Sequence, residues 1–307
     1  MTLKKEGPLA FPITPMKADL TLDLARFEEH VSWMVERAAP ALFVACGTGE
    51  FASLSVDEVV ELTRVAVEVS EGVPVFVGAG QALPNAVACA RQAEASGAAG
   101  LLLFPPYLRE FEIGGLVDYV RSVANSTGLP LVLYQRDGIA FEPDVLSQLL
   151  DLPNVAGLKD GLGDVERMQR VVSSVGDRLV YFNGMPTAET YQPSYAVAGV
   201  PFYSSAVFNF VPEVSWAFWR ALRGGDDSTV QSLVAEFFVP LAELRRKVRG
   251  YAIALVKAGV QVRLGYAGPV RPPLVEAAAE HILLLEKIVS RGIDLAAAGR
   301  ADDDTSY

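Results

Sequence analysis

Eight short apolar segments alternate with longer segments of helical periodicity, and this alternation constrains the fold more than any other feature of the chain. Several of the apolar segments lack apolar–polar alternation, which is typical of parallel strands buried on both faces. The predicted strands are 9–14, 41–45, 75–77, 100–104, 131–134, 155–159, 179–182 and 200–204. The predicted helices are 23–37, 56–69, 85–95, 113–124, 143–150, 165–175, 187–198 and 211–222. Ser55 and Glu58 form a capping box at the start of the second helix.

Eight strand–helix units without a second domain signal predict an α/β fold, a (β/α)8 barrel. A doubly wound open sheet is the alternative, but it requires fewer strands or a clear switch point. After Arg223-Gly224-Gly225 the strand signal ends, and helices are predicted at 228–246, 251–258 and 273–290. We therefore expect a barrel that holds the active site over residues 1–225 and a helical C-terminal region, 226–307, that packs on the outside of the barrel. Such an extension often supports oligomerisation.

The composition indicates a protein with a large core and no nucleic-acid or membrane partner. Of the 307 residues 51% are hydrophobic, and the net charge of −11 is unfavourable for binding nucleic acid or anionic membranes. Cys46 and Cys89 are too far apart in sequence for a zinc site or a disulfide framework, and free thiols suit a reducing cytoplasm. No apolar run reaches the roughly 18 residues of a membrane span, and the first residues lack the apolar stretch of a secretory signal. A cytoplasmic location is expected.

Lys159 ends the apolar run Val155-Ala156-Gly157-Leu158, so an amine is expected at the end of a buried strand. Burial disfavours the ammonium form, so the pKa of such a lysine falls and the neutral amine becomes a nucleophile toward carbonyl carbon. The other lysines lie in the N-terminal segment or in predicted helices near the C-terminus. The alternative is a lysine that buries its stem and extends its amine into water.

In a (β/α)8 barrel the catalytic groups lie at the C-terminal ends of the strands. Besides Lys159, these ends supply Tyr134, a phenol that can relay protons, and a turn that contains Gly47 and Thr48. The other candidates for substrate binding at strand ends are Arg136, Asn183, Ser204 and Ser205. This set holds what is needed to form a Schiff base with a 2-oxo acid, whose carboxylate Thr48 and nearby backbone N–H groups can hold.

Each of these residues also has a purely structural interpretation. Tyr134 can be a barrel aromatic with its hydroxyl at the rim, and Thr48 can belong to a tight turn between two glycines. Arg136 can pair with Asp137 at the surface, and the two serines can satisfy local backbone groups. Gly78-Ala79-Gly80 lacks the third small residue of a dinucleotide-binding fingerprint, so no such cofactor is predicted.

Three segments resemble motifs of the dihydrodipicolinate synthase / N-acetylneuraminate lyase family: Gly47-Thr48-Gly49-Glu50, Tyr134-Gln135-Arg136-Asp137 and Gly157-Leu158-Lys159-Asp160. The resemblance runs from about Pro8 to the C-terminal helices. It implies a (β/α)8 barrel with a helical C-terminal region, usually a homotetramer, that needs no metal or organic cofactor. It also implies that Lys159 forms an imine with a 2-oxo acid and that Tyr134 relays protons.

Departures from the family pattern distinguish between its branches. The synthases carry two threonines in the turn, and Gly47 stands where the first would be; Leu108 stands where they have a second relay tyrosine. The acidic residues that neuraminate lyases have after strand seven are missing here. The 47–51 turn, the 134–137 loop and segment 203–210 instead resemble the 5-dehydro-4-deoxyglucarate dehydratases. These enzymes convert a sugar diacid to 2,5-dioxopentanoate, water and carbon dioxide.

For such a substrate, Arg136 and the two serines are candidates for holding the distal carboxylate, which needs a cation or several donors when it leaves water. Two alternatives remain open. One is an aldolase of the same family that cleaves a 2-keto-3-deoxy sugar acid and releases pyruvate. The other is a binding protein or regulator on a barrel that has lost catalysis, which the presence of both Lys159 and Tyr134 disfavours.

Overall fold

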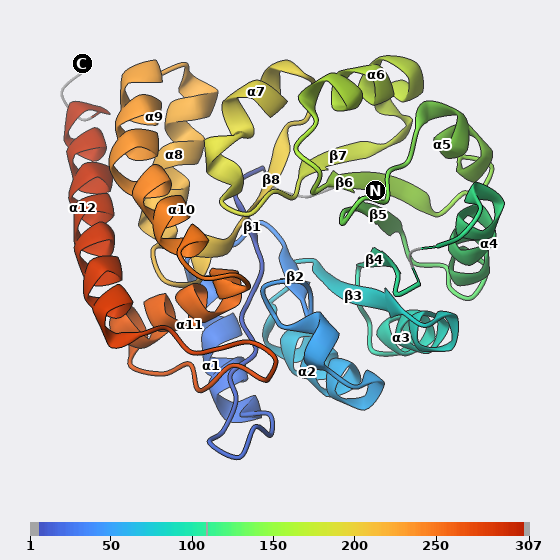
Figure 1. Cartoon of the computed structure of the whole chain (residues 1–307), viewed down its shortest axis with the longest axis horizontal. Coiled ribbons are helices and arrows are strands. Elements are labelled where there is room, and N and C mark those ends of the chain that lie inside the picture. Colours follow the sequence, from blue (N-terminus) through green and yellow to red (C-terminus); the bar gives the residue numbers. More distant parts are fainter. Residues whose placement is uncertain (1–5, 109, 304–307) are drawn as a thin grey trace.

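In the computed structural model, which describes residues 6–108 and 110–303, eight parallel strands pair in chain order. The last strand pairs with the first and closes the barrel (Figure 1), so the barrel prediction is confirmed and the open sheet is excluded. The strands are β1 Leu9–Ala10, β2 Leu42–Val44, β3 Val75–Gln81, β4 Gly100–Pro106, β5 Leu131–Gln135, β6 Val155–Asp160, β7 Val180–Asn183 and β8 Phe202–Ser205. Lys4 and Lys5 lie outside the described residues.

The first strand is shorter than predicted, because after Ala10 the backbone forms hydrogen bonds with the side chain of Asn209 and not with the neighbouring strands. Pro12 has no N–H to donate, and the Ile13 N–H donates to Asn209 Oδ1 (2.9 Å). Asn209 Nδ2 donates in turn to the Phe11 carbonyl (2.9 Å). An asparagine from the segment after β8 thus satisfies the chain that leaves β1.

Helices surround the barrel close to their predicted positions. They are α1 Leu24–Glu36, α2 Val56–Val69, α3 Leu83–Ala95, α4 Ile113–Ala124, α5 Pro143–Leu149, α6 Val165–Val175, α7 Gln192–Val197 and α8 Pro212–Gly224. The capping box of α2 is present: the Glu58 N–H donates to Ser55 Oγ (3.2 Å), and the Ser55 N–H donates to Glu58 Oε2 (2.9 Å). The helix predicted from residue 187 begins later than expected, because Thr187 has a left-handed φ of 54°. A 3₁₀ turn, η3 Ala188–Thr190, precedes α7.

The C-terminal region is helical, as predicted, with different boundaries. Its elements are α9 Asp227–Leu233, the π-helical turn η5 Val234–Phe238, α10 Val239–Arg246, α11 Tyr251–Leu264 and α12 Ala279–Asp303. The predicted start of the last helix at residue 273 was wrong: residues 271–274 form a turn, in which the Leu274 N–H donates to the Arg271 carbonyl (3.1 Å), and α12 begins at Ala279. These helices share a hydrophobic core with α8, and they stand together on one side of the barrel (Figure 1).

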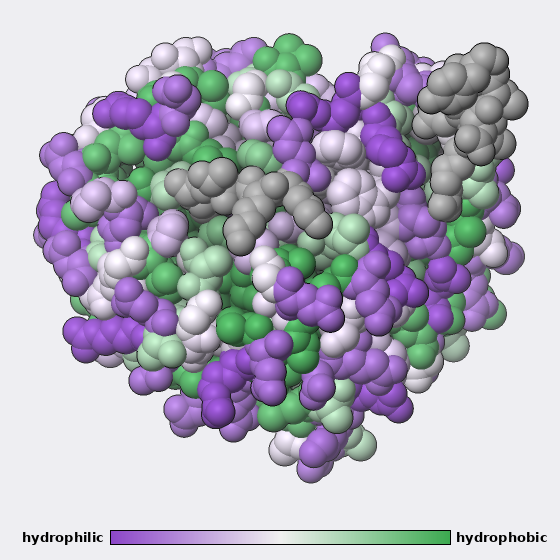
Figure 2. Space-filling view, turned by 180° about the vertical axis from the view of Figure 1, so that it is seen from behind, coloured by the Kyte–Doolittle hydropathy of each residue, from purple (hydrophilic) through white to green (hydrophobic). Residues whose placement is uncertain are grey.

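The barrel interior is filled by stacked aromatic rings below the strand ends. Phe11 stacks on Phe43 with ring centroids 4.6 Å apart, and Phe43 stacks on Phe76 at 4.8 Å. Seen from behind, polar residues cover most of the surface and hydrophobic areas between them are small (Figure 2). Within the described ranges, no helix is long and apolar enough to cross a membrane.

Candidate active site

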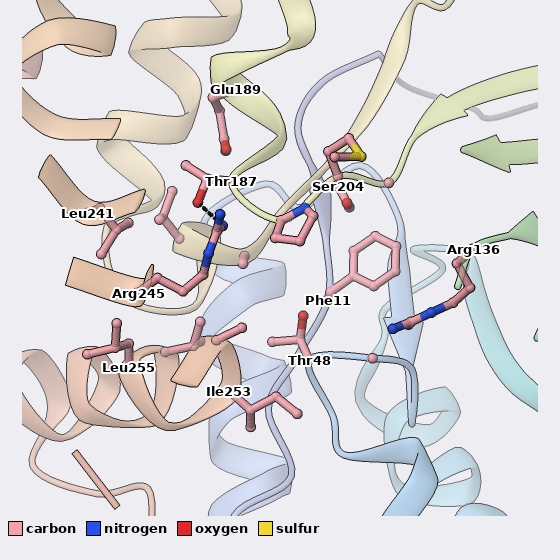
Figure 3. Close-up of a pocket in the computed structure, with 18 of the residues that line it drawn as sticks. Phe11, Thr48, Arg136, Thr187, Glu189, Ser204, Leu241, Arg245, Ile253 and Leu255 are labelled. Atoms are coloured by element: carbon pink, nitrogen blue, oxygen red, sulfur yellow. Dashed lines mark hydrogen bonds between the residues drawn. The ribbon is translucent and has the colours of Figure 1, made fainter. Parts of the chain in front are cut away.

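A cavity of about 230 Å³ lies at the C-terminal ends of the strands (Figure 3). Six of the residues predicted for the site line it: Gly47, Thr48, Tyr134, Arg136, Lys159 and Ser204. The rest of its wall comes from Phe11, from the segment 184–189, from residues that follow β8 and from side chains of α10 and α11. The strand-end positions therefore converge on one space, and the C-terminal region covers part of it.

Asn183 and Ser205 do not line this cavity, and both are fully buried behind it. Asn183 Nδ2 donates to the Ala188 carbonyl (2.9 Å) and to Gln192 Oε1 (3.0 Å). Ser205 Oγ donates to Glu189 Oε1 (2.6 Å). Their polar atoms hold the β7–α7 segment and β8 in place, so the geometry assigns both residues a positioning role.

Lys159 lies at the end of β6 with only 5% of its surface exposed. Its Nζ is 4.0 Å from the centroid of the Phe11 ring and 4.5 Å from that of Tyr134. Burial lowers the pKa of Lys159 from 10.5 to about 7; a Cys46 thiolate would raise it, and the Arg136 guanidinium lowers it. Because burial raises the pKa of Cys46 to about 12, its thiol is neutral and does not stabilise the ammonium at neutral pH. A large share of the lysine is therefore a neutral amine.

Tyr134 stands beside this amine because β5 and β6 pair in a register that places Tyr134 opposite Lys159. The tyrosine hydroxyl donates to the Gly184 carbonyl (3.1 Å). Burial raises the pKa of Tyr134 to about 12, so the phenol keeps its proton at neutral pH. The backbone at Gly184 approaches the lysine so closely that a Cβ there would lie 2.6 Å from Lys159 Cε, which excludes larger residues.

A hydrogen-bonded network behind the cavity, which was not predicted from the sequence, fixes the end of β6. The fully buried Asp160 accepts hydrogen bonds from Gln135 Nε2 (2.7 Å) and from the Leu162 N–H (3.1 Å) through Oδ1. Its Oδ2 accepts from the Gly163 N–H (3.2 Å) and from the Tyr195 hydroxyl. The alternation of side chains along a strand could have identified these two residues. Gln135 directly follows Tyr134 and Asp160 directly follows Lys159, so both must point away from the cavity.

Glu50, the last residue of the motif Gly47-Thr48-Gly49-Glu50, anchors the turn. Glu50 has a left-handed φ of 61°, and its buried carboxylate pairs with Lys257 Nζ of α11 at 2.5 Å. The second carboxylate oxygen accepts from the Arg271 N–H (3.0 Å). Thr14 Oγ1 donates to the Gly49 carbonyl (2.8 Å). The C-terminal region therefore holds the turn in place from outside the barrel.

Replacing Lys257 with methionine is expected to lower the free energy of unfolding by about 3–5 kcal/mol, because the buried Glu50 carboxylate loses its cation. Urea unfolding followed by circular dichroism measures the change. The double variant Glu50→Gln, Lys257→Met is the control: it leaves no unpaired charge and should recover part of the loss. A loss below about 1 kcal/mol in the single variant would contradict a structural role for the pair.

A second polar group lies at the other end of the cavity, where Thr187, Glu189 and Arg245 line the wall (Figure 3). Arg245 Nη1 donates to Thr187 Oγ1 (2.5 Å). Glu189 is fully buried: Oε1 accepts from Ser205, and Oε2 has no hydrogen-bond partner among the described residues. Burial raises the pKa of Glu189 to about 7. None of the three was predicted, because Thr187 and Glu189 fell in a helix predicted from residue 187 and Arg245 in a helical region expected on the outside of the barrel.

The chemistry available at this site is that of an amine nucleophile beside a phenol, with hydroxyls and guanidinium groups to receive anions. Nowhere in the described residues do three or more histidine, cysteine or acidic side chains gather closely enough to hold a metal ion. The arrangement suits imine formation with a carbonyl compound that carries negative charge.

The comparisons with known proteins agree with this chemistry. The family model described as the dihydrodipicolinate synthetase family matches residues 4–291. The chain is 51% identical over 292 residues to a probable 5-dehydro-4-deoxyglucarate dehydratase 1 of Streptomyces coelicolor, covering 93% of this chain and 92% of the relative. It is 43% identical to a probable 5-dehydro-4-deoxyglucarate dehydratase of Rhizobium rhizogenes, covering 94% and 97%. Among solved structures, dihydrodipicolinate synthase from Bacillus clausii has a TM-score of 0.85 at 28% identity, covering 92% and 96%.

Proposed function

Because the chain belongs to the dihydrodipicolinate synthetase family, we propose that it is a decarboxylating dehydratase acting through a Schiff base on Lys159. Its substrate is 5-dehydro-4-deoxy-D-glucarate, and its products are 2,5-dioxopentanoate, water and carbon dioxide. Relatives at 40–51% identity that carry this activity in their names support the substrate. The observation that carries the mechanism is the buried amine of Lys159 beside the hydroxyl-bearing ring of Tyr134.

The first steps use the amine and the phenol. The neutral amine of Lys159 adds to the ketone, Tyr134 relays protons, and water leaves as the iminium forms. Thr48 and the N–H groups of its turn hold the carboxylate next to the ketone. The iminium acidifies the neighbouring methylene, and loss of a proton there gives an enamine. The enamine expels the β-hydroxyl, which takes up a proton and leaves as water.

The remaining steps use the conjugated iminium that dehydration leaves. The bond to the distal carboxylate breaks, carbon dioxide leaves, and the electron pair moves into the conjugated system toward nitrogen. The carbon that lost the carboxylate bears a hydroxyl and is now an enol, which becomes the aldehyde when the chain is protonated. Water then hydrolyses the iminium, which releases 2,5-dioxopentanoate and regenerates Lys159.

Product analysis tests this proposal against the aldolase. When purified protein is incubated with 5-dehydro-4-deoxyglucarate, NMR is expected to detect 2,5-dioxopentanoate and carbon dioxide in equal amounts. Pyruvate in place of these products would favour the aldolase. Borohydride reduction in the presence of pyruvate addresses the binding-protein alternative, because a mass increase at Lys159 requires an imine.

We also propose that the chain forms a homo-oligomer, a tetramer, in the cytoplasm. What supports assembly is the family resemblance together with apolar side chains that are exposed on the single chain, among them Val197 (85%) and Leu283 (60%). Light scattering of the purified protein measures its mass, and a monomer would refute the proposal.

A further inference from the structure

Arg245 is a partly buried cation that forms no direct ion pair within the described ranges, although the buried carboxyl group of Glu189 at the same wall raises its pKa. Arg245 Nη1 donates a hydrogen bond to the hydroxyl of Thr187 (2.5 Å). Burial lowers the pKa of Arg245 by more, so the charge is held in a place that disfavours it. Arg136, the cation that the sequence predicted for the site, differs, because its Nε pairs with Asp137 Oδ2 at 2.8 Å. A charged group kept at a cavity wall with a hydroxyl, and no directly paired carboxylate, as its partner suggests that an anion arrives from outside.

The two guanidinium groups lie at opposite ends of the cavity. Arg136 lies beside the reacting groups, with Cζ 5.3 Å from the ring centroid of Tyr134. Arg245 comes from α10, and in the view of Figure 3 Thr48 and Phe11 lie between the two arginines. The wall near Arg245 is otherwise largely apolar, with Leu241, Ile253, Leu255 and Val256. A ligand that reaches from the amine to this end therefore meets the Arg245 guanidinium, with the Thr187 hydroxyl and the buried Glu189 carboxyl group beside it.

The protein maintains unfavourable local structure at this end. Thr187 is β-branched, yet its backbone is left-handed (φ 54°, ψ 60°), a conformation that costs of order 1–3 kcal/mol. The chain directly before α10 forms the π-helical turn η5, a feature often found at functional sites, and η3 contacts it. Together these features place the Thr187 hydroxyl and the Arg245 guanidinium at the same wall of the cavity.

We infer that Arg245, together with Thr187, receives the distal carboxylate of the substrate and selects dicarboxylic over monocarboxylic 2-oxo acids. The inference rests on the proposed function, in which the keto end is bound at Lys159. A six-carbon oxo-diacid has one negative charge at each end, and Arg136 and Arg245 lie on opposite sides of the cavity (Figure 3). Arg136 remains at the keto end, and the assignment of the distal carboxylate to it is replaced. A guanidinium can bind a carboxylate through two parallel hydrogen bonds, and the threonine hydroxyl adds a third donor.

Calorimetric titration with two matched probes tests this inference. 2-Oxoadipate and 2-oxohexanoate both have six carbons, and they differ in whether the far end is a carboxylate or a methyl group. The native protein is expected to bind 2-oxoadipate about 10–100-fold more tightly, as a charge-assisted hydrogen bond implies. Arg245→Met should abolish this preference and leave 2-oxohexanoate binding within twofold of the native value. Unchanged binding of that probe also reports that the variant is folded.

Two further variants make the result specific. Arg246→Met removes the exposed neighbouring charge and should keep the preference, whereas Arg245→Lys should keep only part of it. The inference is overturned if the native protein binds both probes equally or binds neither, or if Arg245→Met weakens both to the same degree. Failure of the proposed function can be distinguished from failure of this inference. Binding of the two probes needs neither dehydration nor decarboxylation, whereas a wrong proposed function would show itself as an absence of 2,5-dioxopentanoate in the product analysis.

Discussion

Replacing Lys159 with alanine is expected to reduce turnover of 5-dehydro-4-deoxyglucarate by about 10⁴-fold or more, because every proposed step passes through the imine on its amine. The variant should also gain no mass at this position when it is reduced with borohydride in the presence of pyruvate. Lys17, an exposed lysine, offers the matched control Lys17→Ala, which should retain both properties. Peptide mass mapping locates the adduct. An active Lys159→Ala protein with an adduct on a different lysine would contradict the proposed mechanism.

The pH dependence of trapping in the native protein checks the same amine independently. With the pKa of Lys159 lowered to about 7, roughly half of the side chain is neutral at pH 7. At the ordinary lysine value of 10.5 only about one molecule in 3,000 would be neutral. The rate of imine formation should therefore rise with pH through about 7 and level off above about 8. A rate that continues to rise tenfold per pH unit up to pH 9 would mean that the amine is not desolvated.

The barrel was predictable because its signals are local. Parallel strands buried on both faces produce continuous apolar runs, and each run is followed by a segment that can form a helix. Even the start of α2 was encoded within four residues, from Ser55 to Glu58. The strand-end rule then brought six of the eight candidate residues to one cavity without any knowledge of their contacts.

The same rule could not say which strand-end side chains face the cavity, because neighbouring residues of a strand point in opposite directions. Ser204 lines the cavity, whereas Ser205 is buried behind it. The register pairs Asp160 with Asn183 and Lys159 with Phe182, so Asn183 points away with Asp160. Strand pairing, which decides these directions, depends on hydrogen bonds between segments that lie far apart in the sequence.

The contribution of the C-terminal region was not predictable for a related reason. Helical periodicity identified the segment around Arg245, but the face that a helix turns toward a barrel depends on packing and on the π-helical turn before it. The partnership of Glu50 with Lys257 joins residues that are about two hundred positions apart, and neither residue type indicates the other. Sequence reasoning therefore located the amine and the phenol but not the groups that hold the site together from outside the barrel.

Replacing Tyr134 with phenylalanine is expected to lower kcat by about 10²–10³-fold while leaving imine formation detectable, because the amine remains but its proton relay is lost. The change removes one hydroxyl, which donates to the Gly184 carbonyl, and keeps the ring that packs beside Lys159 Nζ. Steady-state kinetics measures the loss of kcat, and borohydride trapping with pyruvate, sampled at equilibrium, should still give the adduct at Lys159. In Tyr134→Phe we therefore expect a low kcat together with a detectable adduct, whereas Lys159→Ala should lose both kcat and the adduct.

The matched control for this prediction is Tyr181→Phe. Tyr181 is also a buried barrel tyrosine whose hydroxyl donates to a backbone carbonyl, that of Gly176 at 2.7 Å, but it does not line the cavity. It should lose the stability of one hydrogen bond, about 1 kcal/mol, with kcat unchanged. If Tyr134→Phe behaved like this control, the hydroxyl of Tyr134 would be structural. Because burial raises the pKa of Tyr134 to about 12, its ionisation should add no limb to the kcat profile below about pH 10, so any step there belongs to another group.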